Sequence, residues 1–492
     1  MNHQLTRVTW VALGMLVVLV GATTYWQTWA RPGLGARQDN EIRRVAEFEV
    51  RRGLILGPNR ILARNIPKKR GTRTFYLREY PQGRLTAHVV GYSTVGRSRA
   101  GLEKSLNGVL TGTGRALSDL VSQQLDKLKG KPIVGDTVVT TLDLKAQKIA
   151  LEQLGTRCGA VTAFDPRTGK VLVMASSPSY NPNLVEHHFD QIEGIRADCR
   201  PAGALFNRAT AGLYAPGSTF KVVTTAAALE LHRYDPGSEF VDPGYCMVYG
   251  KRVNNFDTSS PFGRISLASA LQYSVNSVFC EIGKALGAKA ILAQAKRFGF
   301  YERPPLETPE GERLPSGLYK NGELWEPKRN SEVDAGRMAF GQERMLVTPL
   351  QMAMVAAGVG NGGIVMKPYV VQKLVSPRGT TSAVTAPERL GRALGPVNAR
   401  DLADMMVRVV QSGTGTRAQI PGYRIGGKTG TAETGVPGRN NVWFIAFAGK
   451  EGERPSVAIA VVVEGQASTG GETAAPIARA VMEALLPTAS NP

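Results

Sequence analysis

The stretch Tyr214-Ala-Pro-Gly-Ser-Thr-Phe-Lys221 decides the fold of this chain, because it sets a serine three residues before a lysine at a predicted helix start. Pro216-Gly217 ends the preceding segment, and Ser218 opens an apolar, alanine-rich run that extends to Leu231. Residues at i and i+3 share a helical face, so Lys221 is predicted to lie beneath the Ser218 hydroxyl. A serine hydroxyl is a weak nucleophile until a neighbouring base removes its proton. The pair therefore predicts a nucleophile and its base, provided that burial or a nearby positive charge keeps the lysine neutral.

Two further segments follow in an order that this chemistry requires. Ser274-Val-Asn276 lies at a predicted break between two helices, where its side chains reach a cleft and the Ser274 hydroxyl relays a proton to a leaving amine. Lys428-Thr-Gly-Thr431 is predicted to be an exposed strand that pairs with a peptide while its lysine and hydroxyls hold a terminal carboxylate. Lys428 also supplies the positive charge that Lys221 needs, and Gly430 lets the substrate backbone come close.

Each of these segments alone has an ordinary structural interpretation. A Ser-x-x-Lys at a helix start is usually a cap followed by a solvated lysine, and a Lys-Thr-Gly is usually a turn. Ser-x-Asn occurs also at Ser105–Asn107 and Ser179–Asn181, so this motif by itself indicates nothing beyond an interhelix cap. Only the ordered set of three predicts an active site.

A rival interpretation uses some of the same residues. Gly422-Tyr-Arg-Ile-Gly-Gly-Lys428-Thr429 matches the phosphate-binding pattern G-x-x-x-x-G-K-[ST]. That loop needs a strand before its glycines and a helix directly after its Lys-Thr. Residues 416–421 do not form a buried strand pattern, and the segment after Thr429 is too rich in glycine and proline for a helix. A nucleotide-hydrolysing protein is therefore disfavoured.

A histidine-dependent serine hydrolase and a metal centre are also disfavoured. The chain has 5 histidines and no Gly-x-Ser-x-Gly elbow. His187-His188 adjoin Glu186 without a third partner at metal-ligand spacing, so they are interpreted as a surface loop. No metal and no cofactor is predicted.

Length and composition indicate a multidomain globular protein. A chain of 492 residues has room for about two to four domains. The net charge of +20 is high, and basic residues crowd the range 31–131, with about 21 against about 8 acidic ones. A positively charged surface of this kind can bind nucleic acid, anionic lipid or an acidic polymer. The alternative is that it is only generic surface charge.

An uncharged run from Val8 to Ala30 predicts a membrane anchor. It has roughly 23 residues, which is enough to cross a bilayer. Trp10 and Trp29 would lie about 28 Å apart on a helix, near the two interfaces, and the aromatic end of the run disfavours a cleaved signal peptide. Positive-inside counting does not favour an exported body, because more arginines follow the run than precede it.

The rest of the chain predicts an α+β fold. Segments 158–165 and 170–175 read as a hairpin, and strands return at 442–448 and 457–463. Helices are expected over 218–231, 265–273, 277–286, 346–359, 398–411, with Asn398 as a cap, and 475–486. This order predicts one antiparallel sheet covered by helices, with the first and last strands as neighbours. Residues 31–148, with short alternating segments and a helix around 116–128, look like a separate smaller module.

The four cysteines, at 158, 199, 246 and 280, show neither a Cys-x-x-Cys pair nor zinc-ligand spacing. One or two disulfides are possible in an exported domain, with Cys246–Cys280 the first candidate, and buried free cysteines are the alternative.

At this point the chain resembles the class B penicillin-binding proteins, the membrane-anchored transpeptidases of bacterial cell-wall synthesis, of the PbpA-like type without appended C-terminal modules. The resemblance covers nearly the whole chain. Beyond the three motifs it rests on Arg52-Gly-Leu-Ile55, Ile61-Leu-Ala63, Thr140-Thr-Leu-Asp143, Asn207-Arg-Ala209, Gly341-Gln342, Thr348–Met352, Asn361-Gly-Gly363, Gly413-Thr-Gly415 and Trp443-Phe444.

The resemblance implies a fold and a domain order. The fold is α+β, a penicillin-binding/serine β-lactamase-like transpeptidase domain with a five-stranded antiparallel sheet, helices on both faces and an all-helical subdomain. It stands behind a single transmembrane helix and a smaller α+β pedestal. The expected boundaries are a cytoplasmic tail at 1–7, an anchor at 8–30, the pedestal at 31–148 and the transpeptidase domain at 149–492. The bulk of the chain is expected on the extracytoplasmic side of the cell membrane.

The resemblance also implies roles for the motif residues. Ser218 is the acyl-enzyme nucleophile and Lys221 its base, and Ser274 and Asn276 line the cleft. Lys428, Thr429, Gly430 and Thr431 bind the terminal carboxylate and backbone, and the N–H groups of Ser218 and Thr431 form the oxyanion hole. The enzyme would cross-link peptidoglycan stem peptides, expel D-Ala from a D-Ala-D-Ala donor and pass the acyl group to an amine acceptor. β-Lactam antibiotics would acylate Ser218. A polytopic glycosyltransferase of the SEDS family is the expected partner, and nucleic acid is not.

Three positions depart from the family pattern: Ala215 where proline is frequent, Val275 where cysteine or aspartate is common, and Gly57-Pro58 in place of Asp-Arg. The first two flank the catalytic atoms, and the third belongs to the pedestal.

Neighbouring functions remain as alternatives. No Glu-x-x-Leu-Asn follows Ser274, which disfavours a β-lactamase because nothing would activate the deacylating water. A D,D-carboxypeptidase would use the same site with water as acceptor. A non-catalytic β-lactam sensor or scaffold would be the other alternative, but only about seven residues precede the anchor, too few for a signalling domain.

Overall fold

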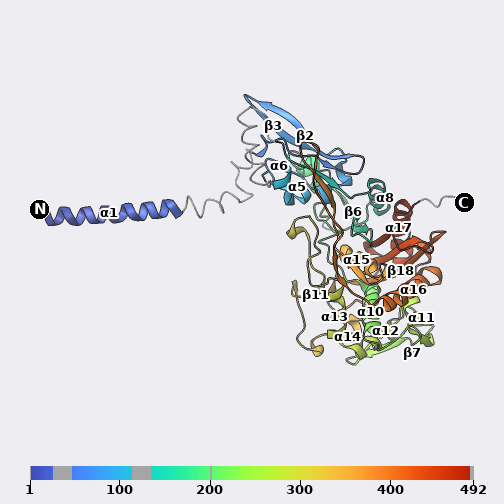
Figure 1. Ribbon diagram of the computed structural model, residues 1–492. Coiled ribbons are helices and arrows are strands. Elements are labelled where there is room, and N and C mark those ends of the chain that lie inside the picture. Colours follow the sequence, from blue (N-terminus) through green and yellow to red (C-terminus); the bar gives the residue numbers. More distant parts are fainter. Residues whose placement is uncertain (1, 26–46, 114–133, 200–201, 488–492) are drawn as a thin grey trace.

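The computed structural model describes residues 2–25, 47–113, 134–199 and 202–487. Its central feature is a five-stranded antiparallel sheet in the order β18-β19-β20-β5-β6 (Figure 1). The strands are β5 (Gly159–Phe164), β6 (Val171–Ser177), β18 (Tyr423–Val436), β19 (Arg439–Lys450) and β20 (Val457–Gln466). β5 and β6 form the predicted hairpin, and β20 pairs with β5. The two sequence ends of the domain are therefore neighbours, as predicted.

The interior strand β19 shows why the sheet needs helices on both faces. Successive side chains of a strand point to opposite faces, and from Val442 to Ala448 both sets in β19 are apolar and fully buried. One face packs on α15 (Pro349–Gly360), and the other packs on α8 (Leu144–Leu154) and α17 (Gly470–Leu485). The α15 side receives Trp443, Ile445 and Phe447, and the α8–α17 side receives Val442, Phe444 and Ala446.

The middle of the chain forms a helical region at one end of the sheet (Figure 1). Its helices are α10 (Lys221–Glu230), α11 (Leu267–Gln272), α12 (Asn276–Leu286), α13 (Ala288–Arg297), α14 (Ala335–Met338) and α16 (Pro396–Ser412). Short strands accompany them: β7 (Glu239–Asp242), β8 (Tyr245–Val248), β9 (Lys251–Asn254), β10 (Gly263–Ser266), β11 (Gly317–Lys320), β12 (Glu323–Leu324), β13 (Met345–Leu346), β14 (Ile364–Met366) and β17 (Arg389–Arg392). The region is thus helical with small ladders at its edge, rather than all-helical.

The starts of α16 and α17 differ from the sequence prediction for reasons that the structure shows. The proposed cap Asn398 is wrong, because Pro396 occupies the first turn of α16 and Gly395 precedes it as the cap. Asn398 instead donates its side-chain amide to Glu230 Oε1 at 2.6 Å. α17 begins at Gly470, five residues before the predicted start, because Thr469 and Glu472 form a reciprocal capping box.

The N-terminal module contains a second sheet, in the order β16-β15-β4-β1-β2-β3. Its strands are β1 (Ile55–Leu56), β2 (Ile61–Arg70), β3 (Arg73–Glu79) and β4 (Thr137–Thr140), joined by β15 (Val371–Val375) and β16 (Thr381–Val384). Three short helices lie beside it: α4 (Ala87–Val90), α5 (Gly101–Ser105) and α6 (Asn107–Thr111). Because β15 and β16 come from within the range expected for the transpeptidase domain, the two parts share hydrogen-bonded strands.

A buried charge cluster stabilises this module. Glu103 Oε1 accepts from Arg78 at 2.6 Å, and Glu103 Oε2 accepts from Arg52 at 2.8 Å. All three side chains are almost fully buried. Burial raises the pKa of Glu103, but the two guanidinium groups outweigh it and hold the pKa below its usual value. The carboxylate therefore stays charged, and removing it would leave two arginines buried without their partner.

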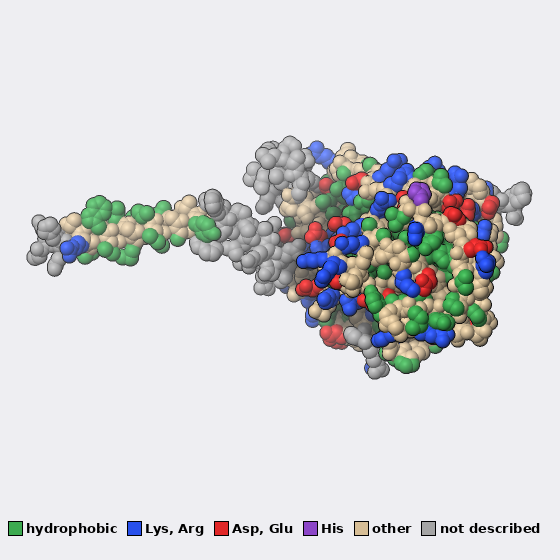
Figure 2. Space-filling view, turned by 90° about the horizontal axis from the view of Figure 1, so that it is seen from below, with side chains coloured by type: hydrophobic (Ala, Val, Ile, Leu, Met, Phe, Trp, Pro, Cys, Tyr) green, Lys and Arg blue, Asp and Glu red, His purple; other side chains and the backbone are tan. Residues whose placement is uncertain are grey.

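Helix α1 (Asn2–Thr24) is the described part of the predicted anchor. Its segment Thr6–Thr24 is long and apolar enough to cross a membrane, with a mean hydropathy of 1.6 and no burial against the rest of the chain. The predicted anchor end with Trp29 and the predicted helix around 116–128 lie outside the described residues. On the body, Lys and Arg side chains are spread over the face seen in Figure 2 with acidic groups among them.

All four cysteines form disulfides. Cys158 bonds to Cys199, and Cys246 bonds to Cys280, as the favoured pairing predicted. The second bond ties β8 to α12, next to the Ser274–Asn276 segment.

Candidate active site

The predicted nucleophile Ser218 lies in a short 3-10 helix, η4 (Gly217–Phe220), which leads directly into α10. The cap of this helix is Pro216, so Ser218 does not serve as a capping residue. Gly217 adopts a φ of +53°, which a residue with a Cβ rarely adopts, and its N–H donates to Gly341 O at 3.1 Å. Trp443 Nε1 donates to Ala215 O at 3.0 Å. These contacts fix the turn and leave Ser218 half-buried at the protein surface.

The serine turn and the Lys-Thr-Gly strand lie against each other. A Cβ on Gly217 would come within 2.9 Å of Thr431 O, and a Cβ on Gly430 would come within 2.9 Å of Pro216 O. Both positions therefore require glycine for the backbones to approach. The structure thus brings together the first and third motifs, which are more than two hundred residues apart in sequence.

Lys221 connects the first motif to the second. Its Nζ donates to Ser274 O at 2.6 Å and to Asn276 Oδ1 at 2.8 Å, and lies 3.3 Å from Ser274 Oγ. The side chain is fully buried. Burial, and secondarily the charge of Lys428, hold the pKa of Lys221 well below its usual value. The amine is therefore neutral at a pH where an exposed lysine is charged, which is the condition for the predicted role as a base.

Lys428 approaches Ser274 from the opposite side. Its Nζ donates to Ser274 Oγ at 2.8 Å and to Thr429 O at 3.1 Å. Burial lowers the pKa of Lys428 to about 7. Ser274 lies between the two lysines in a left-handed conformation with φ of +62°, at the break between α11 and α12. Strained backbone of this kind is concentrated at functional sites, and here it directs one hydroxyl toward both amines.

Threonine hydroxyls complete the strand side of the site. Thr429 Oγ1 lies 2.6 Å from Thr414 Oγ1, and Thr431 Oγ1 accepts from Gly470 N at 3.4 Å. Thr414 is not a residue that the sequence singled out, apart from its place in the family pattern Gly413-Thr-Gly415. The structure adds it to the site, because its hydroxyl shares a hydrogen bond with the Thr429 hydroxyl.

Strand β18, which carries the third motif, is an edge strand of the sheet. The expectation that this motif is exposed was wrong in one respect: Lys428, Thr429 and Gly430 are buried, because η4 and α16 pack against them. The strand runs without interruption through Gly426–Thr431, and no helix follows the Lys-Thr within the described residues 423–450. A phosphate-binding loop is therefore excluded.

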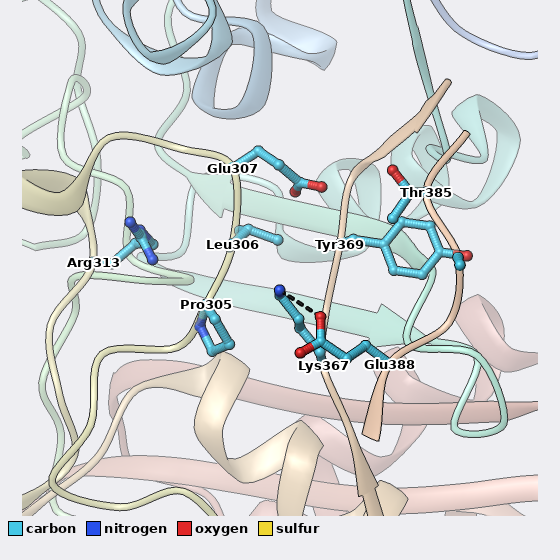
Figure 3. Close-up of a pocket in the computed structure, with 9 residues that line it drawn as sticks. Pro305, Leu306, Glu307, Arg313, Lys367, Tyr369, Thr385 and Glu388 are labelled. Atoms are coloured by element: carbon cyan, nitrogen blue, oxygen red, sulfur yellow. Dashed lines mark hydrogen bonds and ion pairs between the residues drawn. The ribbon is translucent and has the colours of Figure 1, made fainter. Parts of the chain in front are cut away.

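A separate cavity of about 370 Å³ lies away from these residues, between the 305–313 loop, the 367–369 segment that leads into β15 and the 385–388 segment that follows β16 (Figure 3). Lys367 and Glu388 form an ion pair of 2.7 Å at its rim. Its lining contains no residue of the three motifs, so it is distinct from the candidate active site.

Comparison with known proteins agrees with this geometry. Residues 159–483 match the family profile of the penicillin binding protein transpeptidase domain, and residues 52–138 match that of the penicillin binding protein A dimerisation domain. The chain therefore belongs to the penicillin-binding protein transpeptidases. This membership confirms the family resemblance, the predicted fold class and the predicted enzyme class.

Individual relatives cover the whole chain. Peptidoglycan D,D-transpeptidase PbpA of Mycolicibacterium smegmatis is 35% identical, with 99% of each chain aligned. Peptidoglycan D,D-transpeptidase PbpA of Mycobacterium tuberculosis is 34% identical, again over 99% of each chain. The solved structure of penicillin-binding protein A from M. tuberculosis, as a ceftriaxone acyl-enzyme complex, superimposes with a TM-score of 0.79 at 33% identity, covering 89% of this chain and 99% of that one.

Proposed function

We propose that this transpeptidase cross-links peptidoglycan stem peptides through an acyl-enzyme on Ser218, releasing D-Ala. One observation carries the proposal: a fully buried lysine with a lowered pKa, three residues after Ser218, holds both polar residues of the second motif. The relatives named D,D-transpeptidase support the reaction, and the acyl-enzyme complex of the M. tuberculosis protein supports β-lactams as inhibitors.

Lys221 acts as the base that activates Ser218. Its two short hydrogen bonds go to Ser274 O and Asn276 Oδ1, which are carbonyl oxygens and only accept. A neutral amine has two N–H bonds, which these oxygens use. Its lone pair is then left for the proton of the Ser218 hydroxyl, so the second motif both positions the lysine and orients its lone pair.

The remaining groups act on the donor peptide. Lys428, Thr429 and Thr431 bind the terminal carboxylate of the D-Ala-D-Ala end, and the peptide pairs with the free edge of β18 beside Gly430. The N–H groups of Ser218, in the first turn of η4, and of Thr431 stabilise the oxyanion. Ser274, which accepts from Lys428, passes its proton to the leaving amine of D-Ala and is reprotonated by Lys221, which holds the proton taken from Ser218 and lies 3.3 Å from Ser274 Oγ. Ser218 is thereby acylated, and D-Ala departs.

The second half of the reaction reverses these roles. An amine of a neighbouring stem peptide attacks the Ser218 ester, Lys221 or Ser274 accepts its proton, and the new amide leaves with Ser218 restored. A β-lactam enters the first half in place of the peptide. Its ring opens on Ser218, and the retained leaving group blocks the acceptor.

The anchor and the disulfides support a proposed location for the protein. We place residues 1–7 in the cytoplasm and the anchor, residues 8–30, in the membrane. The pedestal, residues 31–148, and the transpeptidase domain, residues 149–492, then lie on the extracytoplasmic side. The apolar α1 and two disulfides, which form in oxidising compartments, support a single-pass protein with an extracytoplasmic body. A polytopic SEDS-family glycosyltransferase is the partner proposed for the anchor and pedestal, testable by co-purification from membranes.

The proposed reaction is tested by supplying a D-Ala-D-Ala stem peptide with and without an amine acceptor. The wild type should release D-Ala and form the cross-linked peptide, whereas Ser218→Ala should do neither. Ser105→Ala, in the Ser-x-Asn of the pedestal, is the matched control and should retain activity. Release of D-Ala by hydrolysis alone, at a rate unaffected by the acceptor, would instead identify a D,D-carboxypeptidase.

A further inference from the structure

Exposed aromatic side chains gather beside the second motif. Phe256, Phe262 and Tyr273 are 81%, 47% and 43% exposed, although aromatic rings of this size are normally mostly buried. The rings of Phe262 and Tyr273 stack with centroids 5.2 Å apart and an interplanar angle of 23°. We call these three residues the aromatic ledge. Figure 2 looks at the end of the molecule that carries β7 and α12 in Figure 1, where hydrophobic side chains lie among basic and acidic ones.

The ledge is continuous with the active site. Tyr273 directly precedes Ser274, and the side-chain amide of Asn276 donates to Asn254 O at 3.1 Å, two residues before Phe256. The segment 254–262 thus lies against Ser274–Asn276. β18 contacts Ser274 through Lys428.

A buried carboxylate holds the ledge in place. Asp242 accepts from Asn255 Nδ2 at 2.9 Å, from Phe262 N at 3.0 Å and from Ser277 Oγ at 2.5 Å. Asn255 Oδ1 in turn accepts from Ser277 N at 2.9 Å. The Asp242 carboxylate therefore binds both ends of the 255–262 segment and also the first turn of α12. The exposed rings are fixed relative to Ser274 and Asn276 rather than carried by a free loop.

We propose that the aromatic ledge is a specificity subsite that binds an aliphatic side chain of the donor peptide, upstream of its D-Ala-D-Ala end. This inference rests on the proposed function. The peptide is proposed to pair with β18, so an upstream side chain that points away from β18 extends past Asn276 toward the ledge. Two stacked rings offer a flat apolar surface without a hydrogen-bonding group at its centre. Such a surface favours a long methylene chain over a methyl group and excludes water from the cleft.

The test compares two donor peptides, Nα,Nε-diacetyl-Lys-D-Ala-D-Ala and Nα-acetyl-Ala-D-Ala-D-Ala, by the rate of D-Ala release. The wild type should prefer the lysyl peptide by on the order of tenfold in kcat/KM, mostly through KM. Phe262→Ala and Tyr273→Ala should reduce this preference severalfold. Tyr273→Phe, which keeps the stacked ring, should retain it. Tyr249→Ala, an aromatic residue that is 75% exposed in the β8–β9 turn, is the matched control.

The outcomes separate the two proposals. If penicillin does not acylate Ser218 in the wild type, the proposed function fails. If acylation and D-Ala release occur but Phe262→Ala keeps the wild-type preference between the two peptides, the ledge is not a subsite. Equal losses on both peptides, with a lowered unfolding temperature, would show that the stacked pair only stabilises the fold.

Discussion

Replacing Lys221 by methionine tests the chemistry most selectively, because methionine has nearly the same length and no basic atom. The change leaves Ser218, Ser274 and Lys428 in place. General-base catalysis typically contributes about 10²- to 10⁴-fold, which corresponds to about 3 to 5 kcal/mol of the activation barrier. The acylation rate of Lys221→Met by a fluorescent penicillin should therefore fall by at least about a hundredfold.

The effect on folding should be small by comparison. The variant loses the donors to Ser274 O and Asn276 Oδ1, worth about 1 kcal/mol each. It also removes the cost of burying an amine, which opposes that loss. The free energy of unfolding should change by less than about 2 kcal/mol.

The assay follows the second-order acylation rate on a gel or by stopped flow, with thermal unfolding measured on the same sample. Lys284→Met, on the exposed surface of α12, is the control for replacing any lysine in this region. A Lys221→Met rate within tenfold of the wild type, in a folded protein, would refute the assignment of Lys221 as the base.

Three other outcomes follow from the structure. Acylation should show a bell-shaped pH profile. The rate falls on the acid side as Lys221, whose pKa is held well below its usual value, becomes protonated, and it falls again above about pH 7 as Lys428 loses the charge that binds the carboxylate. A rate that rises steadily through the alkaline range would contradict the proposed role of Lys428. Glu103→Gln should lower the free energy of unfolding by about 3 to 5 kcal/mol in a denaturant titration, since it leaves two buried arginines without a carboxylate, whereas Glu152→Gln on the exposed face of α8 should have almost no effect. Replacing Cys246 and Cys280 by serine should lower the free energy of unfolding by about 3 to 4 kcal/mol, because their bond closes a segment with a sequence separation of 34. An unchanged unfolding temperature would show that the bond contributes nothing to stability.

The sequence predicted the central sheet because its strands carry strong local signals. Residues 442–448 and 457–463 are apolar on both faces, which is typical of strands with helices on each side. The three motifs predicted the site only as an ordered set, because each of them alone has an ordinary structural interpretation. Lys221 and Lys428 both contact Ser274, and this depends on the fold. The sequence predicted that the three motifs share one site through the family resemblance.

Other features depend on contacts that no local pattern carries. The shared sheet of the pedestal needs β15 and β16, which are more than two hundred residues beyond β4 in sequence. The role of Thr414 depends on one hydroxyl contact across two elements. Asn398 is a good capping residue by type, but Pro396 ahead of it begins the helix earlier. The Asp242 carboxylate joins β7, the 255–262 segment and α12 through hydrogen bonds. None of these three segments carries a sequence pattern that predicts the connection.

The central claim is that Ser218 becomes acylated because Lys221 accepts its proton. Intact-protein mass spectrometry after exposure to penicillin, followed by peptide mapping, tests it most directly. One adduct with the mass of penicillin should appear on the peptide that contains Ser218, and it should be absent from Ser218→Ala. An adduct on any other residue, or one that persists in Ser218→Ala, would contradict the account.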